Sequence, residues 1–379
     1  MKNILYLSRS GDFGGMEKHI LDLINAVNKD YKVYVFSPNG PMISKYISAG
    51  ANHYEAYPLG SFDYEFALKV RRFVIENQID IVHTHELEVS VLGLMGLIGV
   101  KNAKKIMHVH TPITNWRHTF LNKIFKAPLN FIANFVVANF VADKVIALTA
   151  IIKNERIYNE LVRPSKIVVI PNAVDISDLQ ISDIDRAKYK TEIIKRYNIP
   201  INSTIIGNLG RMTIEKGYDL LIKAFATNFK NDINENVKYH LLLVGGGKLE
   251  DTYQTLVNDL GISDQVTITG KFNDEDKVKF YSTFDYMVFP SRAEGFGYVL
   301  CEAMYFGIPV LASDLPILKQ VSDNKLMYFK TDNLDDLELK LSEFVELNVD
   351  TSEYKKALQA YSTQSFKKNY LSLYNLLTR

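Results

Sequence analysis

The chain has 379 residues, with 44 lysines and arginines against 43 aspartates and glutamates, which leaves a net charge of +1. This balance gives no overall attraction to nucleic acid, so any basic binding site has to be local. The single cysteine, Cys301, excludes an internal disulfide framework and fits a reducing cytosol. The length predicts two domains of ordinary size, each able to bury its own core.

Apolar runs of strand length alternate with helical patterns along the whole sequence, which is typical of parallel α/β sheets. The first expected strands are 4–8, 33–36, 80–83, 105–109, 144–148 and 167–170. A polar, aspartate-rich stretch at 175–190 is expected to connect two domains. The second set of strands is 204–208, 239–244, 266–269, 286–289, 309–312 and 326–329. We therefore expect two doubly wound domains facing each other, with ligands at the carboxyl ends of their strands.

The most apolar stretch, residues 129–142, is shorter than a membrane-spanning helix and is interrupted by asparagines such as Asn134 and Asn139. We expect a buried core helix here. Its flank, from Trp116 to Lys126, mixes basic with aromatic side chains. Peripheral contact with a membrane surface is therefore an alternative to an ordinary amphipathic helix.

Two pairs of histidines lie at the ends of two expected strands. His83 and His85 share one face of their strand, and so do His108 and His110. Such pairs can ligate zinc in other settings, but the sequence offers no third ligand at metal spacing. We expect His83 and His108 to be core residues.

The segment from Glu294 to Glu302 is the most informative part of the chain. It places two carboxylates eight residues apart across a glycine-rich turn between an apolar strand and a helix. At Gly295 and Gly297, free N–H groups of the helix N-terminus would be available to a phosphate. Glu294 would lie in the loop, and Glu302 about two turns along the helix if the helix starts near Gly295. Two carboxylates so placed suit the hydroxyl groups of a nucleotide sugar.

A basic pair, Arg211 and Lys216, follows the first strand of the second domain. Cleavage of a sugar–diphosphate bond leaves negative charge on the leaving group, which these two cations could bind. Fixed cations make a metal unnecessary, so we expect no metal cofactor. The alternative is a metal at one of two Asp-x-Asp sequences, 183–185 and 274–276. The first lies in the connecting stretch, and the second is typical of the acidic first turn of a helix.

The segment 294–302 resembles the E-x7-E signature of retaining glycosyltransferases with the GT-B fold, most closely those of glycosyltransferase family 4. Four further motifs, 171–175, 210–217, 244–247 and 307–310, occur in that family's order and approximate spacing. The resemblance covers most of the C-terminal half and, more loosely, the N-terminal half. It implies a GT-B architecture of two facing Rossmann-like, doubly wound domains. An acceptor-binding domain of residues 1–172 and 362–379 would include a terminal helix that crosses back to it, and residues 173–361 would bind the nucleotide sugar.

The resemblance also implies roles for single residues. His110, beside the donor sugar, would hydrogen-bond a sugar hydroxyl, and Arg211 and Lys216 would bind the diphosphate. With Glu294 they form the expected catalytic set. His85 and the adjacent Glu86 would line the acceptor cleft. The expected donor-binding residues are Gly14, Gly15, Phe272, Gly295, Phe296, Gly297 and Glu302. Structural alternatives are a plain tight turn at the first glycine pair and a solvated lysine at 216, and the residues do not distinguish uracil from guanine.

We therefore expect a retaining hexosyltransferase that uses a UDP- or GDP-sugar and a glycan or lipid-linked acceptor in cell-surface polysaccharide synthesis. No carboxylate of the first domain stands out as a nucleophile, so same-face attack is the expected route to retention. The expected location is the cytoplasm, at the inner face of the membrane if the basic and aromatic flank binds there. A sugar-nucleotide epimerase of the same fold and a non-catalytic GT-B subunit are the alternatives. A degenerate subunit should have lost a signature cation or carboxylate, yet all four are present.

Overall fold

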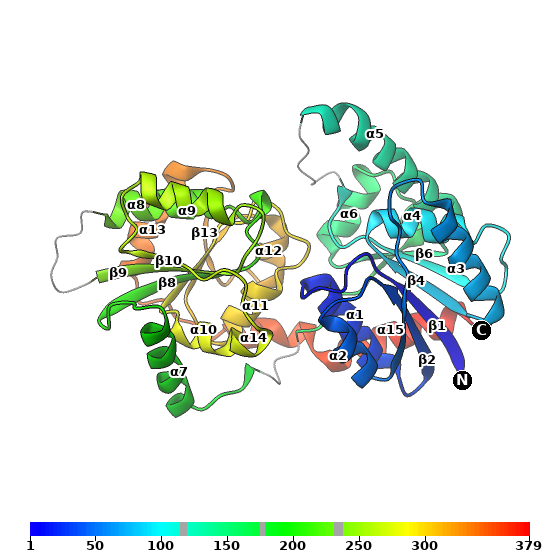
Figure 1. The fold of residues 1–379 in the computed structure, drawn as a ribbon, viewed down its shortest axis with the longest axis horizontal. Coiled ribbons are helices and arrows are strands. Elements are labelled where there is room, and N and C mark those ends of the chain that lie inside the picture. The colour runs from blue at the N-terminus through cyan, green and yellow to red at the C-terminus, as the bar shows by residue number, and fades with distance from the viewer. Residues whose placement is uncertain (114–119, 175–178, 231–237) are drawn as a thin grey trace. The chain divides into compact units, whose positions relative to one another are not determined.

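The computed structural model describes residues 1–113, 120–174, 179–230 and 238–379. Residues 116–119 of the basic and aromatic flank and Asp175 of the motif at 171–175 lie outside these residues. The chain forms two compact units, Met1–Ala173 with Tyr361–Arg379 (unit 1) and Val174–Ala360 (unit 2). Figure 1 shows a sheet covered by helices in each unit. The acceptor-binding and donor-binding roles of the two units stay predictions.

Unit 1 contains a seven-stranded parallel sheet in the order β3-β2-β1-β4-β5-β6-β7. Its strands are β1 (Lys2–Leu7), β2 (Tyr31–Ser37), β3 (Ala51–Glu55), β4 (Ile81–His85), β5 (Lys104–His108), β6 (Lys144–Ala147) and β7 (Ile167–Val169). Its helices are α1 (Gly15–Val27), α2 (Met42–Ser48), α3 (Tyr64–Glu76), α4 (Leu87–Met95), α5 (Phe120–Val136), a π-helical turn (Val137–Val141), α6 (Ala150–Tyr158) and α15 (Thr363–Leu377). The chain order reverses between β1 and β4, and open sheets of this kind bind ligands at such a reversal.

The C-terminal helix α15 belongs to the core of unit 1. It packs beside α1, and its Phe366, Tyr370 and Tyr374 are buried in the same cluster as β1 (Figure 1). The Tyr374 hydroxyl lies 2.8 Å from Nδ1 of His83, which is a buried core residue as expected. The return of the terminal helix to the first domain is therefore confirmed.

The expectation of a buried core helix at residues 129–142 was wrong. Leu129 and Ile132 are 47% and 58% exposed, whereas Asn134 and Asn139 are buried. Burial of the asparagines is possible because their amides find partners. Asn134 Nδ2 donates to a carboxylate oxygen at 3.1 Å, and Asn139 Nδ2 donates to main-chain carbonyls at 2.9 and 3.1 Å. Hydrogen bonding, rather than side-chain polarity alone, decides which face of this segment is inside.

Unit 2 contains a six-stranded parallel sheet in the order β10-β9-β8-β11-β12-β13, so its chain order reverses between β8 and β11. Its strands are β8 (Ser203–Leu209), β9 (Lys238–Val244), β10 (Val266–Ile268), β11 (Tyr286–Phe289), β12 (Val310–Ser313) and β13 (Met327–Phe329). Its helices are α7 (Asp183–Arg196), α8 (Tyr218–Phe229), α9 (Glu250–Asp259), α10 (Lys277–Thr283), α11 (Tyr298–Tyr305), α12 (Pro316–Val321), α13 (Leu334–Glu346) and α14 (Tyr354–Leu358). Two Rossmann-like parallel α/β units confirm the expected fold class.

The stretch expected as a connection, residues 175–190, is in its described part mainly the start of α7. The Ser182 side chain caps this helix by accepting from the Asp185 N–H at 3.1 Å. Lys190 Nζ donates to Asp285 Oδ1 at 2.5 Å, which ties α7 to the residue preceding β11. The first Asp-x-Asp sequence is therefore the acidic first turn of a helix, which the helix dipole favours.

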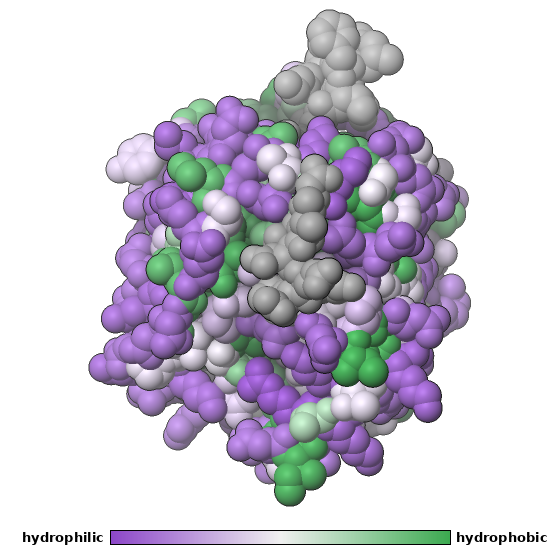
Figure 2. Space-filling view, turned by 90° about the vertical axis from the view of Figure 1, so that its left-hand side faces the viewer, coloured by the Kyte–Doolittle hydropathy of each residue, from purple (hydrophilic) through white to green (hydrophobic). Residues whose placement is uncertain are grey.

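Among the described residues, no helix combines the length and the apolar character that crossing a membrane requires. The face shown in Figure 2 is mostly hydrophilic, and its hydrophobic residues form small separate groups. Outside the grey atoms, this face therefore presents no broad apolar surface.

Candidate functional site

A run of glycines after β9 supports the loop that carries Arg211. A Cβ atom on Gly245 would lie 2.1 Å from the carbonyl oxygen of Gly210, and one on Gly247 would lie 2.5 Å from that of Met212. Only glycine allows such close contact between two main chains. The glycine motif therefore positions the loop at the carboxyl end of β8, beside the reversal of strand order.

Lys216 and Glu294, predicted as catalytic residues, form a partly buried ion pair. Lys216 Nζ donates to Glu294 Oε1 at 2.5 Å, and Ser291 Oγ donates to the same oxygen at 2.7 Å. The glutamate side chain is 8% exposed and the lysine side chain 25%. Because the two residues follow β8 and β11, the structure brings them together at the strand-order reversal of unit 2. A cation and a hydrogen-bond acceptor are thus available to one ligand.

Arg211 is exposed, and within the described parts of the chain its guanidinium has no hydrogen-bond or ion-pair partner. It lies five residues before Lys216, in the loop after β8. A guanidinium without a protein partner keeps all of its donors for a ligand, and its planar fork fits two oxygens of a phosphate. The geometry of unit 2 is thus compatible with the predicted diphosphate role.

Arg292 fixes the two loops of this site and was missed by the sequence reasoning. Its guanidinium makes a bidentate contact with Asp219 at 2.7 Å for each bond, and it donates to the Ile214 carbonyl at 2.9 Å and to Asp332 at 2.5 Å. The two aspartates raise the pKa of Arg292, and the side chain is 8% exposed. Its position two residues before Glu294 was the only sequence signal, and no spacing rule connects it to its partners.

Glu302 is held by its own unit rather than left open to solvent. Lys277 Nζ donates to Oε1 at 2.9 Å, and the Tyr281 hydroxyl donates to Oε2 at 2.7 Å. Burial, followed by the Glu302 carboxylate, raises the pKa of Tyr281 well above its usual value. The helix begins at Tyr298, so Glu302 lies about one turn along α11, not two turns as expected. A hydroxyl group that binds Glu302 must share these oxygens.

The other predicted donor-binding residues of unit 2 surround these loops. Gly297 is the N-cap of α11 with φ of 91°, a conformation that favours glycine, and Phe296 is buried. Gly295 is partly buried in the same turn. Phe272 is partly buried after β10, with its ring 5.4 Å from that of Phe280. Their contacts with a donor stay predictions.

In unit 1, the structure brings His85 and His110 into direct contact. His85 Nδ1 and His110 Nε2 lie 3.2 Å apart. Burial of the imidazole, followed by the positive charge of Arg156, lowers the pKa of His110 to about 3. Glu86, the next residue after β4, has φ of 76° and its N–H donates to the His108 carbonyl at 3.0 Å. A non-glycine residue in this conformation is strained, and such strain clusters at functional sites.

Gly14 and Gly15 lie where β1 gives way to α1. Gly14 is the N-cap of this helix in an extended conformation, and its carbonyl accepts from the Lys18 N–H at 2.9 Å. A Cβ atom at Gly14 would lie 2.4 Å from a carboxylate oxygen of Glu17. The loop lies at the strand-order reversal of unit 1, and its predicted approach to the diphosphate stays a prediction.

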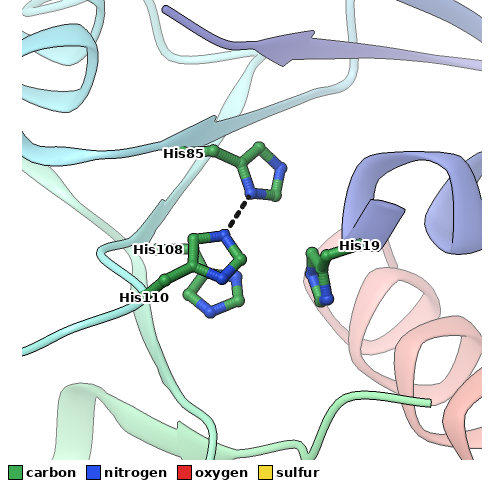
Figure 3. A group of neighbouring side chains, drawn as sticks. All are labelled: His19, His85, His108 and His110. Atoms are coloured by element: carbon green, nitrogen blue, oxygen red, sulfur yellow. Dashed lines mark hydrogen bonds between the residues drawn. The ribbon is translucent and has the colours of Figure 1, made fainter. Parts of the chain in front are cut away.

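A histidine from a helix lies close to three of the four histidines discussed above. His19, on α1, lies within metal-ligand spacing of His85, His108 and His110 (Figure 3). The expectation that no third ligand stands at metal spacing was therefore wrong. Sequence reasoning missed His19 because it lies 66 positions before His85, and only the fold brings the two together. The predicted independence of the reaction from metal stays a prediction.

Two family models cover most of the chain. The model described as Glycosyltransferase Family 4 matches residues 13–178, and the model described as Glycosyl transferases group 1 matches residues 189–364. Parallel sheets in two units, each with candidate site residues at its strand-order reversal, define a glycosyltransferase of the GT-B class. The chain belongs to the family 4 type of these enzymes.

Known proteins show the same relationship at low sequence identity. An uncharacterized glycosyltransferase from Haemophilus influenzae is 24% identical over 86% of this chain and 84% of the relative. An alpha-monoglucosyldiacylglycerol synthase from Streptococcus pneumoniae is 26% identical over 69% of this chain, which spans 60% of that relative. HepE from Anabaena, solved in complex with UDP-glucose, is 19% identical, with a TM-score of 0.81 over 98% of this chain and 99% of that one. At this low identity, the similarity to HepE shows that the two chains share a fold.

Proposed function

We propose that this chain is a retaining hexosyltransferase that takes a sugar from a UDP- or GDP-sugar and transfers it to a glycan or glycolipid. The observation that carries the proposal is the pair Lys216–Glu294 at the strand-order reversal of unit 2. Arg211 lies five residues before Lys216, and its guanidinium has no partner among the described residues. The two cations stabilise the departing nucleoside diphosphate, and Glu294 holds a sugar hydroxyl. Transfer then needs no metal at the diphosphate, because fixed cations meet the developing charge.

Retention by same-face attack is part of the proposal. An oxygen of the departing diphosphate takes the proton of the acceptor hydroxyl while the bond to the anomeric carbon breaks. Glu294 is not offered as a nucleophile, because one of its oxygens already accepts from Lys216 and Ser291. His110 is kept as a ligand of the donor sugar. Isolation of a sugar covalently attached to any side chain would contradict this mechanism.

The enzyme is proposed to act on its glycan or lipid-linked acceptor at the cytoplasmic face of a membrane, in cell-surface polysaccharide synthesis. The exposed side chains of Leu129 and Ile132 on α5, next to the exposed Lys126, support this. Apolar side chains beside a base suit an anionic lipid surface. Co-sedimentation with vesicles containing anionic lipid should fall when both side chains are changed to serine. Leu339→Ser, at a leucine that is 56% exposed in unit 2, is the control.

The first test of the donor is thermal stabilisation by UDP, GDP, ADP and their sugars, with and without EDTA. A shift with one nucleotide series that survives EDTA supports the cation pair and names the base. A shift that EDTA abolishes would contradict metal-independent binding. HepE was solved in complex with UDP, with UDP and glucose, and with UDP-glucose. Uridine nucleotides are therefore the first ligands to test.

The second test separates catalysis from binding alone. Arg211→Ala and Lys216→Ala should each lower the turnover of nucleotide sugar about 100- to 1000-fold, because each removes a charge that stabilises the transition state. Leu339→Ser should keep wild-type turnover. Binding without transfer to any acceptor in the wild type would support a non-catalytic subunit, and conversion of the donor to its epimer without acceptor would support an epimerase.

A further inference from the structure

Four histidine side chains of unit 1 converge although three different elements carry them. His19 lies on α1, His85 ends β4, His108 ends β5, and His110 follows two residues later. One ring nitrogen of each lies within 4.8 Å of the other three. Figure 3 shows the His19 ring across from the other three rings. We propose that these four imidazoles bind one divalent transition-metal ion of the zinc type.

One distance within the cluster already matches that between two ligands of one ion. His85 Nδ1 and His110 Nε2 are 3.2 Å apart. Two nitrogens bound tetrahedrally to zinc at about 2.0–2.1 Å lie about 3.3 Å from each other. Because no two nitrogens of the group are farther apart than 4.8 Å, binding would draw the most distant pair together by about 1.5 Å. The His108 and His110 rings are stacked with their centroids 4.0 Å apart, so at least one of them has to turn for both to point a nitrogen at the ion.

Buried ring nitrogens without partners point to a missing ligand. In the described structure, both ring nitrogens of His108 are buried and have no hydrogen-bond partner. The His108 side chain has no exposed surface. Native proteins rarely leave buried polar atoms unsatisfied, and the binding of an ion is one established reason for such atoms. A single ion would satisfy one lone pair on each ring.

The chemistry of the donor set selects the class of ion. Imidazole nitrogens suit zinc, copper and nickel, whereas magnesium and calcium require oxygen ligands. The four ligands are neutral, so the bound ion keeps its charge of +2 without compensation from a ligand. We therefore expect an ion that a chelator removes. It would tie α1 to the ends of β4 and β5, where the strand order of unit 1 reverses.

This metal site goes beyond the proposed transfer reaction but shares two predicted site residues with it, His85 and His110. The variants are therefore made at the other two ligands, and the readout is bound metal rather than turnover. The test uses the full-length chain, freed of its purification tag and stripped with EDTA. Zinc is added back, and bound zinc per chain is measured by mass spectrometry after dialysis. Cobalt(II) is the second probe, because a four-coordinate site gives intense visible absorption.

The variant His108→Leu removes one ligand but replaces a side chain that has no hydrogen bond to any described residue. His19→Leu tests a second ligand from another element, and neither residue belongs to the predicted transfer site. His53→Gln is the control, because it removes a histidine of unit 1 outside the cluster. We expect one zinc per chain and the cobalt absorption in wild type and control. Both leucine variants should retain less than a tenth of each signal.

Thermal unfolding adds a readout that does not depend on counting metal. Zinc should raise the unfolding temperature of the wild type and the control, and should leave that of His108→Leu unchanged. Without metal, His108→Leu should unfold no earlier than the wild type. Wild-type protein that binds no zinc above background overturns the proposal. So do leucine variants that bind zinc or cobalt as well as the wild type.

Discussion

Arg156 and Glu160 form a fully buried ion pair, with 2.9 Å between Nη1 and Oε2. Each of the two side chains hydrogen-bonds one end of the loop that contains His110. The Arg156 guanidinium also donates to the carbonyl of Val109, and Glu160 Oε1 accepts from the N–H of Ile113 at 2.6 Å. The charge of Arg156 contributes to the low pKa of His110. A structural pair thus sets both the position and the electrostatics of a predicted site residue.

Replacing only Arg156 should strongly destabilise unit 1. Arg156→Met leaves the Glu160 carboxylate buried without its cation, so the free energy of unfolding should fall by about 3–5 kcal/mol. Urea unfolding followed by circular dichroism measures the change. The double variant Arg156→Met, Glu160→Gln should lose less than the sum of the two single variants, because the remaining side chains carry no charge.

The exposed pair Lys340–Glu343 on α13 gives the matched control. Lys340→Met should leave urea unfolding unchanged within error, because an exposed pair is screened by solvent. The structural role of Arg156 would be disproved by a variant that unfolds at the same urea concentration as this control.

Arg292→Lys should weaken donor binding although the charge is kept. A lysine cannot make the bidentate contact with Asp219 while also reaching Asp332 and the Ile214 carbonyl. The loop that leads to Lys216 should then lose its fixed position. We expect KM for the nucleotide sugar to rise at least tenfold with a smaller change in kcat. Arg196→Lys, at an arginine bonded to Asp276 on the surface, should leave KM unchanged. Equal KM values for both variants would remove Arg292 from the positioning role.

Gly217→Ala should damage unit 2 more than an ordinary glycine substitution. Gly217 has φ of 67°, and a Cβ atom there would lie 2.1 Å from the main-chain oxygen of Pro290. The strained conformation alone costs about 1–3 kcal/mol, and the clash adds to it. Gly60→Ala is the control, because no atom lies within 4 Å of its Cβ position. Chemical denaturation of both variants should show a large loss for Gly217→Ala only. Similar losses would mean that contact between the two loops is dispensable.

Much of the fold could be predicted because buried parallel strands appear as short apolar runs between helical patterns. The edge strand β3, Ala51–Glu55, was not predicted. Its sequence Ala-Asn-His-Tyr-Glu is polar and mostly exposed, so it carries no apolar signal. This strand is held in the sheet by its pairing with β2, and the residues of the strand itself carry no pattern that reveals the pairing.

The candidate site could be predicted only where its residues are close in sequence. The turn between Glu294 and Glu302 has a local pattern of strand, glycines and helix. By contrast, Lys277 reaches Glu302 from another helix, and Arg156 reaches the His110 loop from 46 residues away. Such partners are chosen by packing between elements, so a single sequence holds no spacing that reveals them.

Glu302→Gln should weaken donor binding and loosen the contact between α10 and α11. The amide keeps one acceptor oxygen, but its NH2 group must face either Lys277 or the Tyr281 hydroxyl. We expect KM for the donor to rise about tenfold, and the free energy of unfolding to fall by about 1–3 kcal/mol. Glu294→Gln should instead lower kcat as well. Isothermal titration with the nucleotide and steady-state kinetics distinguish the two, and identical small effects would refute the separate roles.

His240 should make the folded state sensitive to acid. Its side chain on β9 is buried, and its ring nitrogen lies 2.8 Å from the Thr267 hydroxyl. Burial lowers the pKa of His240 to about 4 in the folded protein, against about 6.5 in an unfolded chain. Between these values the unfolded chain binds a proton that the folded chain does not. The free energy of unfolding therefore falls as the pH drops from 6.5 to 4, and is unaffected by this residue above pH 7.

The variant His240→Gln measures this effect because glutamine keeps a hydrogen-bonding group and does not titrate. The wild type should lose about 2 kcal/mol more than the variant between pH 7 and pH 5 in the free energy of unfolding. Urea unfolding at both pH values gives the difference, in which all other titrating groups cancel. Parallel losses in the two proteins would show that His240 is protonated in the folded state with an ordinary pKa.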